Sequence, residues 1–246
     1  MRSIYLITGA TSEIGMAYIE KLIEGNEAAT VIAVYRTMSD RFSELIAKES
    51  NLEIFALHAD LSVEEDVEAL IENINEEELI PTHILHLAAA NYVFNKIKQW
   101  DAEAVKRDMQ ISVFSFARIC QEYLPKMAKQ HYGKVVAMLS SVTLGAPPKF
   151  VSQYATVKGA LLGFVKSAAA EYVDKSINVN AISPNMMETK FLADIDSRLV
   201  EMAAANSSMK RNVKVNETVD AIEFLMSDRA SYINGENLNL SGGDYM

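Results

Sequence analysis

The sequence has very little cysteine and no excess of basic residues. Its single cysteine, Cys120, excludes an internal disulfide and is typical of a reducing compartment. Because Cys120 lies in an apolar helical stretch, we expect a buried structural thiol. The 23 lysines and arginines are outnumbered by 33 acidic residues, giving a net charge of −10. Nucleic acid requires a basic surface, so it is not an expected partner.

Long hydrophobic runs are also missing near the start of the sequence. The first apolar run, Ile4 to Ile7, is too short for a signal peptide or a membrane-spanning helix. We therefore expect a cytoplasmic protein without a membrane partner. We also expect no metal site.

Short β-branched runs alternate with helical stretches over all 246 residues, and no linker or repeat interrupts them. This alternation predicts a single α/β domain over residues 1–246, with a doubly wound parallel sheet of about seven strands and helices on both faces. The predicted strands are Ser3–Thr8, Thr30–Tyr35, Glu53–Leu57, His83–Ala88, Lys134–Leu139, Ile177–Ile182 and Asn237–Leu240.

The first strand runs into a glycine-containing turn, Thr8–Gly15, before a helix begins. Gly9 permits a tight turn, and Gly15 permits close packing of helix on strand. The backbone N–H groups at the helix start could receive a pyrophosphate, as in a Rossmann-like domain. The alternative is a plain strand–helix turn. The candidate cofactor-binding residues here are Gly9, Thr11, Ser12, Ile14 and Gly15.

The second strand ends at Arg36, and the next acidic residue is Asp40. NAD-binding domains place an acid there for the ribose 2′-hydroxyl, whereas an arginine accommodates the 2′-phosphate of NADP. The sequence therefore favours NADP(H), with NAD(H) possible. The alternative is a solvated arginine at a strand end.

Tyr154 and Lys158 are four residues apart, so on a helix they share a face. An ammonium beside a phenol favours the phenolate and lowers the tyrosine pKa, which predicts an acid/base group. Ser141, thirteen residues upstream, could hydrogen-bond the same substrate oxygen. Its neighbour Ser140 is interpreted as a strand-end residue. Taken alone, the pair could be a surface contact.

Taken together, these motifs resemble the compact branch of the short-chain dehydrogenase/reductase family, and more loosely its 3-oxoacyl-thioester reductases. The resemblance extends to Asp60-Leu61, to the segment Asn180–Pro184 and to Ser241-Gly242-Gly243. It implies that Tyr154 protonates a carbonyl, that Lys158 holds the nicotinamide ribose and that Ser141 fixes the carbonyl oxygen. It further implies cofactor contacts from Asp60, Leu61, Ala88, Ala89, Pro184, Met187 and Thr189.

Four positions depart from the family pattern. Glu13 replaces a glycine near the pyrophosphate, and Leu87-Ala88-Ala89-Ala90 replaces Asn-Asn-Ala-Gly, with Asn91 one residue late. Ser112 stands where the family has the asparagine of its proton relay, and we expect it to substitute as a catalytic residue. Asn185 replaces a glycine, and asparagine tolerates a positive φ.

The substrate is expected to be a small carbonyl or alcohol compound, either a ketone or a 3-oxoacyl compound. In the family a lid covers the active site, here around residues 186–213, and its methionines suit an apolar ligand. Two alternatives stay open: a nucleotide-sensing protein with weak catalysis, and a sugar or sugar-nucleotide reductase.

Small residues at helical spacing, Ala155, Gly159 and Gly163, predict close helix pairing in a homodimer or homotetramer. The alternative is that this stripe packs on the protein's own sheet.

Overall fold

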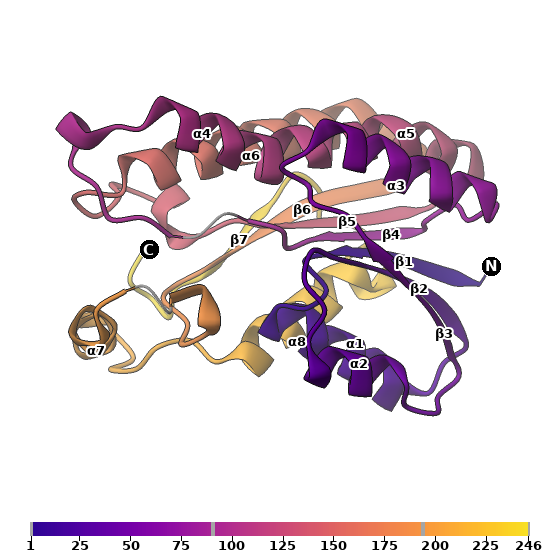
Figure 1. Ribbon diagram of the computed structural model, residues 1–246, viewed down its shortest axis with the longest axis horizontal. Coiled ribbons are helices and arrows are strands. Elements are labelled where there is room, and N and C mark those ends of the chain that lie inside the picture. Colours follow the sequence, from indigo (N-terminus) through magenta and orange to yellow (C-terminus); the bar gives the residue numbers. More distant parts are fainter. Residues whose placement is uncertain (1, 90–91, 193–194, 246) are drawn as a thin grey trace.

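The computed structural model describes residues 2–89, 92–192 and 195–245, and over these ranges the chain forms one parallel sheet between two layers of helices (Figure 1). The strands are β1 (Ser3–Thr8), β2 (Ala29–Tyr35), β3 (Leu52–His58), β4 (His83–His86), β5 (Gly133–Met138), β6 (Ile177–Pro184) and β7 (Asn237–Leu240). The helices are α1 (Glu13–Gly25), α2 (Asp40–Ile46), α3 (Glu64–Glu76), α4 (Ala102–Met109), α5 (Ser115–Gln130), α6 (Ser152–Tyr172), α7 (Ser197–Asn206) and α8 (Val215–Met226).

The strand order is β3-β2-β1-β4-β5-β6-β7, with every neighbouring pair parallel. Helices α3, α4, α5 and α6 cover one face of the sheet, and α1, α2 and α8 cover the other (Figure 1). The order reverses direction between β1 and β4, and ligands bind at such a switch point in open α/β sheets. The predicted doubly wound fold is therefore confirmed.

Two hydrophobic cores lie on opposite faces of the sheet because successive strand residues point in opposite directions. Leu6 packs in the core under α3, α5 and α6, and its neighbour Ile7 packs in the core under α1 and α8. Cys120 belongs to the first core, where burial raises the pKa of its thiol. This confirms the expectation of a buried structural cysteine.

The predicted strands agree with the structure to within two residues at each end, including β4, which was predicted to continue through Ala88 but ends at His86. After Thr8 the neighbouring β1 gives way to the glycine turn. The backbone N–H of Ala88 therefore donates to the Thr8 hydroxyl, at 3.4 Å, instead of continuing a ladder.

Within the described residues, no helix combines the length and the apolar character needed to cross a membrane. Over the same residues, no group of three or more His, Cys, Asp or Glu side chains is arranged to hold a metal ion.

Candidate active site

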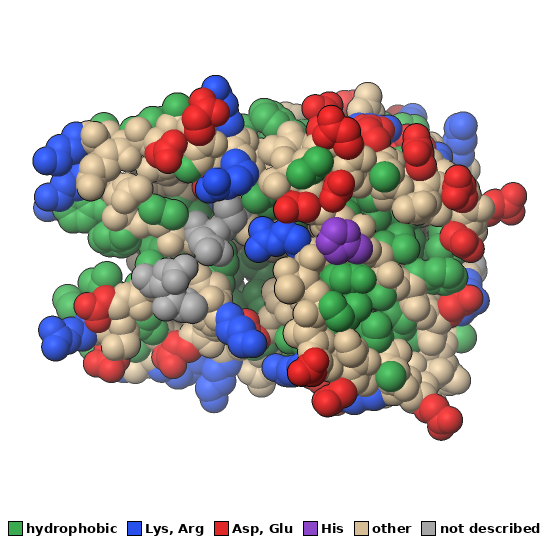
Figure 2. All heavy atoms as spheres, viewed as in Figure 1, with side chains coloured by type: hydrophobic (Ala, Val, Ile, Leu, Met, Phe, Trp, Pro, Cys, Tyr) green, Lys and Arg blue, Asp and Glu red, His purple; other side chains and the backbone are tan. Residues whose placement is uncertain are grey.

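A cavity of about 550 Å³ lies at the carboxyl ends of the strands, and it collects residues from every loop that follows them. Figure 2 shows the hollow between the two halves of the molecule, with Lys and Arg side chains at its edge. All but two of the predicted site residues line it; Gly15 and Ser112 do not.

The glycine turn brings backbone to the wall of this cavity. Gly9 has φ +68°, and a Cβ there would lie 3.0 Å from the Ala88 nitrogen. A Cβ on Gly15 would lie 2.7 Å from the Gly9 carbonyl oxygen. Ser12 caps α1 by accepting a hydrogen bond from the Gly15 N–H at 3.0 Å. Gly15 thus supports the turn from behind, while Gly9, Thr11, Ser12 and Ile14 face the cavity.

The segment after β4 passes close to the turn because its side chains are small. Ala88 and Ala89 line the cavity, as predicted. Thr8 Oγ1 accepts from the backbone N–H groups of Leu87 and Ala88, at 3.3 and 3.4 Å, and so holds the segment in place. Ala90 and Asn91 lie outside the described residues.

Arg36, Asp60 and Leu61 line the far end of the cavity, beyond the ends of β2 and β3. Burial opposes ionisation of Asp60, but hydrogen bonds from Ser62 and the Arg36 charge outweigh it and lower the Asp60 pKa. The Asp60 carboxyl group is therefore ionised at neutral pH. Arg36 remains available as a cation at the cavity edge.

Tyr154 and Lys158 lie in the first turns of α6. Both line the end of the cavity opposite to Arg36 and Asp60. Burial raises the pKa of the Tyr154 phenol well above its ordinary value, against a smaller lowering by a hydrogen bond with Ser140. The Lys158 ammonium lies 5.8 Å from the centre of the Tyr154 ring and donates to the Met138 carbonyl oxygen at 2.7 Å. The expected lowering of the Tyr154 pKa by Lys158 is therefore wrong for this structure, because desolvation dominates.

The two adjacent serines have different partners. Ser140 begins the 3₁₀ turn Ser141–Thr143, and its Oγ accepts the Val142 N–H at 3.4 Å. Ser141 donates from Oγ to Asn185 Oδ1 at 3.3 Å, and Asn185 in turn donates to Asp244 at 2.6 Å. Both serines line the cavity together with Tyr154 and Lys158, so Ser141 stays the predicted partner of the substrate oxygen.

Ser112 lies in a π-helical turn, Gln110–Phe114, and is buried behind the cavity wall. Its neighbour Ile111 lines the cavity in its place. The Ser112 carbonyl oxygen lies 3.1 Å from His86 Nε2, and His86 Nδ1 lies 2.8 Å from Thr8 Oγ1. A carbonyl only accepts, so Nε2 carries the proton and Nδ1 accepts from the Thr8 hydroxyl.

Pro184, Met187 and Thr189 line the cavity from the segment that follows β6, as predicted. The sequence reasoning missed Tyr92, Lys190 and Tyr245, which line it as well. Lys190 directly follows Thr189, so its position was a usable signal. Tyr92 and Tyr245 lie in irregular segments that give no periodic signal.

A dinucleotide fits these residues. The glycine turn and the first residues of α1 line the cavity, and backbone N–H groups at a helix start can receive a pyrophosphate. Arg36 and Asp60 bound one end, and Tyr154 with Lys158 bounds the other. Thr11, Ser12 and Thr189 lie between and offer hydroxyl groups.

Comparison with known proteins agrees with this geometry. The family model described as Enoyl-(Acyl carrier protein) reductase matches residues 9–244. The chain belongs to the short-chain dehydrogenase/reductase family. It is thus an NAD(P)-dependent oxidoreductase.

Known relatives in this family are distant but match over nearly full length. The 3-oxoacyl-[acyl-carrier-protein] reductase FabG of Buchnera aphidicola is 28% identical and is matched over 100% of this chain and 88% of its own. Two solved structures share the fold at 24% identity and a TM-score of 0.86. They are a 4-hydroxyisoleucine dehydrogenase complexed with NADH (98% of each chain) and a 3-oxoacyl (acyl-carrier-protein) reductase from Agrobacterium tumefaciens C58 with NADP bound (98% of this chain, 93% of that one).

Proposed function

We propose that the protein is an NADPH-dependent reductase of a ketone or 3-oxoacyl compound, acting through a Ser-Tyr-Lys site. The observation that carries this proposal is that Tyr154, Lys158 and Ser141 line the same cavity as the glycine turn and Arg36. Residues 186–213 would form the lid of this cavity.

A protonated Tyr154 fits the role of proton donor in the proposed reduction. Its raised pKa keeps the proton on the phenol at neutral pH, so the phenol can donate it to a carbonyl oxygen. When bound, the nicotinamide would supply the hydride. The protein's part is to hold the carbonyl with Ser141, to give the Tyr154 proton to its oxygen, and to stabilise the resulting phenolate by the Lys158 ammonium.

Aromatic rings beside the phenol support an apolar substrate. Tyr92 packs edge-on against Tyr154 with ring centres 4.8 Å apart, and Phe191 lies 6.3 Å from the same ring. Both line the cavity, together with Met186 and Met187. A carbonyl with apolar flanks would bury them against these side chains.

Replacement of the phenol tests the proposal. Tyr154→Phe should retain NADPH binding, and turnover of a ketone found by screening should fall by about 10²–10⁴-fold. Tyr172→Phe, at the far end of the same helix, is the matched control and should leave turnover unchanged. Wild-type turnover in Tyr154→Phe would mean that another group supplies the proton.

A further inference from the structure

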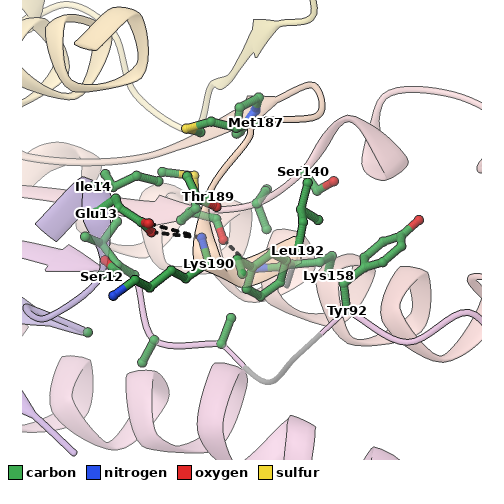
Figure 3. A pocket seen from close by; sticks show the side chains of 18 of the residues that line it. Ser12, Glu13, Ile14, Tyr92, Ser140, Lys158, Met187, Thr189, Lys190 and Leu192 are labelled. Atoms are coloured by element: carbon green, nitrogen blue, oxygen red, sulfur yellow. Dashed lines mark hydrogen bonds between the residues drawn. The ribbon is translucent and has the colours of Figure 1, made fainter. Parts of the chain in front are cut away.

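Glu13 bonds directly to the segment that follows β6. Its two carboxylate oxygens accept the backbone N–H of Lys190, at 3.1 and 3.2 Å (Figure 3). Glu13 is the first residue of α1, where a carboxylate is also favoured by the helix dipole. The bond therefore links the nucleotide-binding turn to the proposed lid across 177 residues of sequence.

The side chain of Lys190 returns toward the same turn. In Figure 3 it runs from the bonded backbone nitrogen toward Ser12, and both residues line the cavity. Among the salt bridges of the described residues, none includes Lys190. Within the described residues its ammonium therefore has no ion-pair partner, and it lies toward the turn whose N–H groups would receive a pyrophosphate.

We propose that Glu13 and Lys190 form a latch that holds residues 186–192, the described start of the lid, over the cofactor pyrophosphate. The Glu13 carboxylate anchors the lid backbone, and the Lys190 ammonium binds the pyrophosphate. This inference rests on a nicotinamide dinucleotide as cofactor, but it does not depend on the carbonyl substrate or on a preference for NADPH.

The charges of Glu13 and Lys190 have complementary effects on a bound pyrophosphate. A carboxylate at the pyrophosphate end of the cavity would repel the phosphates, and a cation drawn to the same place offsets that repulsion. Because the carboxylate is occupied by the lid N–H, the ammonium remains free for the phosphates. The lid must then break a charge-assisted hydrogen bond before the dinucleotide can leave.

The first test needs no cofactor. Hydrogen exchange in the protein alone should become at least about tenfold faster for the amide of Lys190 in Glu13→Gly, because a charge-assisted hydrogen bond no longer protects it. Glu13→Gln keeps an accepting oxygen and should show a smaller increase. Glu20→Gln removes the same charge from the same helix, where it faces Arg41 and Lys48, and should change nothing. Unchanged exchange at Lys190 in Glu13→Gly would overturn the latch.

The second test measures release of the dinucleotide by stopped-flow fluorescence. Dissociation of both NADPH and NADH should be about tenfold faster from Glu13→Gly than from the wild type. Equal dissociation rates would overturn the latch, even if the exchange result held.

Lys190→Met keeps the backbone N–H but removes the cation. It should weaken binding of both dinucleotides and reduce the dependence of affinity on salt. Unchanged affinity and unchanged salt dependence would overturn the role of the ammonium. These measurements use no carbonyl substrate, so they stand apart from a failure of the proposed reaction.

Discussion

The Lys158 ammonium donates to the Met138 carbonyl oxygen at 2.7 Å, so a charge buried inside the protein is held by the end of β5. Burial lowers the pKa of Lys158 to about 8 from its ordinary 10.5. Between these two values the unfolded chain binds a proton that the folded protein does not, so stability should rise with pH across that window. Below pH 8 both states are protonated, and the full cost of burying the charge remains.

Lys158→Met should therefore stabilise the protein while damaging its function. At pH 7 we expect a gain of about 1–3 kcal/mol in the free energy of unfolding, because a buried charge gives way to an apolar side chain. The rise in stability between pH 8 and 10.5 should shrink, and NADPH should bind more weakly. Urea unfolding at several pH values checks the first two, and fluorescence titration checks the third. A less stable variant at pH 7 would contradict this account.

Cofactor choice should depend on Arg36. A charge-assisted hydrogen bond to the 2′-phosphate is worth about 1.5–3 kcal/mol, so NADPH should bind at least about tenfold more tightly than NADH. Arg36→Ala should lose that difference. Arg41→Ala, which removes a nearby cation that faces Glu20 instead of the cavity, is the control. Titration of both cofactors into each variant measures the preference. An unchanged preference for NADPH in Arg36→Ala would mean that Arg36 does not bind the 2′-phosphate.

Substitutions of Ser140 and of Ser141 should have different effects on turnover and on stability. Ser140→Ala removes a hydroxyl that lowers the Tyr154 pKa, so the pH profile should shift to higher pH and turnover should fall by about 10–100-fold. Ser141→Ala breaks the contact with Asn185 and should lower stability more than turnover. Kinetics over pH 6–10 with thermal unfolding distinguish the two. A larger turnover loss in Ser141→Ala would support Ser141 as the serine that fixes the carbonyl.

The fold could be predicted from the sequence because the spacing of apolar residues in strands and helices is a local property of the chain. β-branched runs marked each strand, and Gly9 marked the first turn by its position. The end of β4 was misjudged because it depends on a hydrogen bond to Thr8, which is 80 residues away from Ala88.

The site was predictable where spacing alone determines geometry, as for Tyr154 and Lys158 on one helix. The pKa of Tyr154 was not, because desolvation depends on tertiary burial by residues such as Tyr92 and Phe191. The choice between Ser140 and Ser141 depends on the direction of the chain at the end of β5. The sequence does not give that direction to within one residue. Glu13 was recognised as a departure, but its partner Lys190 appears only when the lid folds back.

His86 should make the protein sensitive to acid. Burial lowers the pKa of His86 from 6.5 to about 3, with a smaller contribution from the Lys158 charge. Below pH 6.5 the unfolded chain gains a proton that folded His86 does not, so its contribution to stability is lost as the pH falls toward 3. By pH 4.5 this single group should cost about 3 kcal/mol.

His86→Gln removes this titration, so its stability should decrease less between pH 7 and pH 4.5 than that of the wild type. His83, whose pKa burial lowers to about 4, is present in both proteins and does not affect the comparison. Urea unfolding at the two pH values measures the difference. Equal losses in the two proteins would mean that His86 is protonated in the fold.

The outer face of α6 should form a subunit interface. Gly159 and Gly163 are exposed, and a Cβ added at either would meet no atom within 4 Å, so this stripe does not pack on the protein's own sheet. Small side chains let helices approach closely, which supports pairing with a second copy. Gly163→Arg should therefore leave the monomer folded but block the approach of a partner. Sedimentation should show a wild-type dimer or tetramer and a 27.3 kDa species for Gly163→Arg.

Gly25→Arg, at an equally open position on the other side of the sheet, is the control. A wild type that sediments only at 27.3 kDa would reject the oligomer, and an assembled Gly163→Arg would place the interface elsewhere.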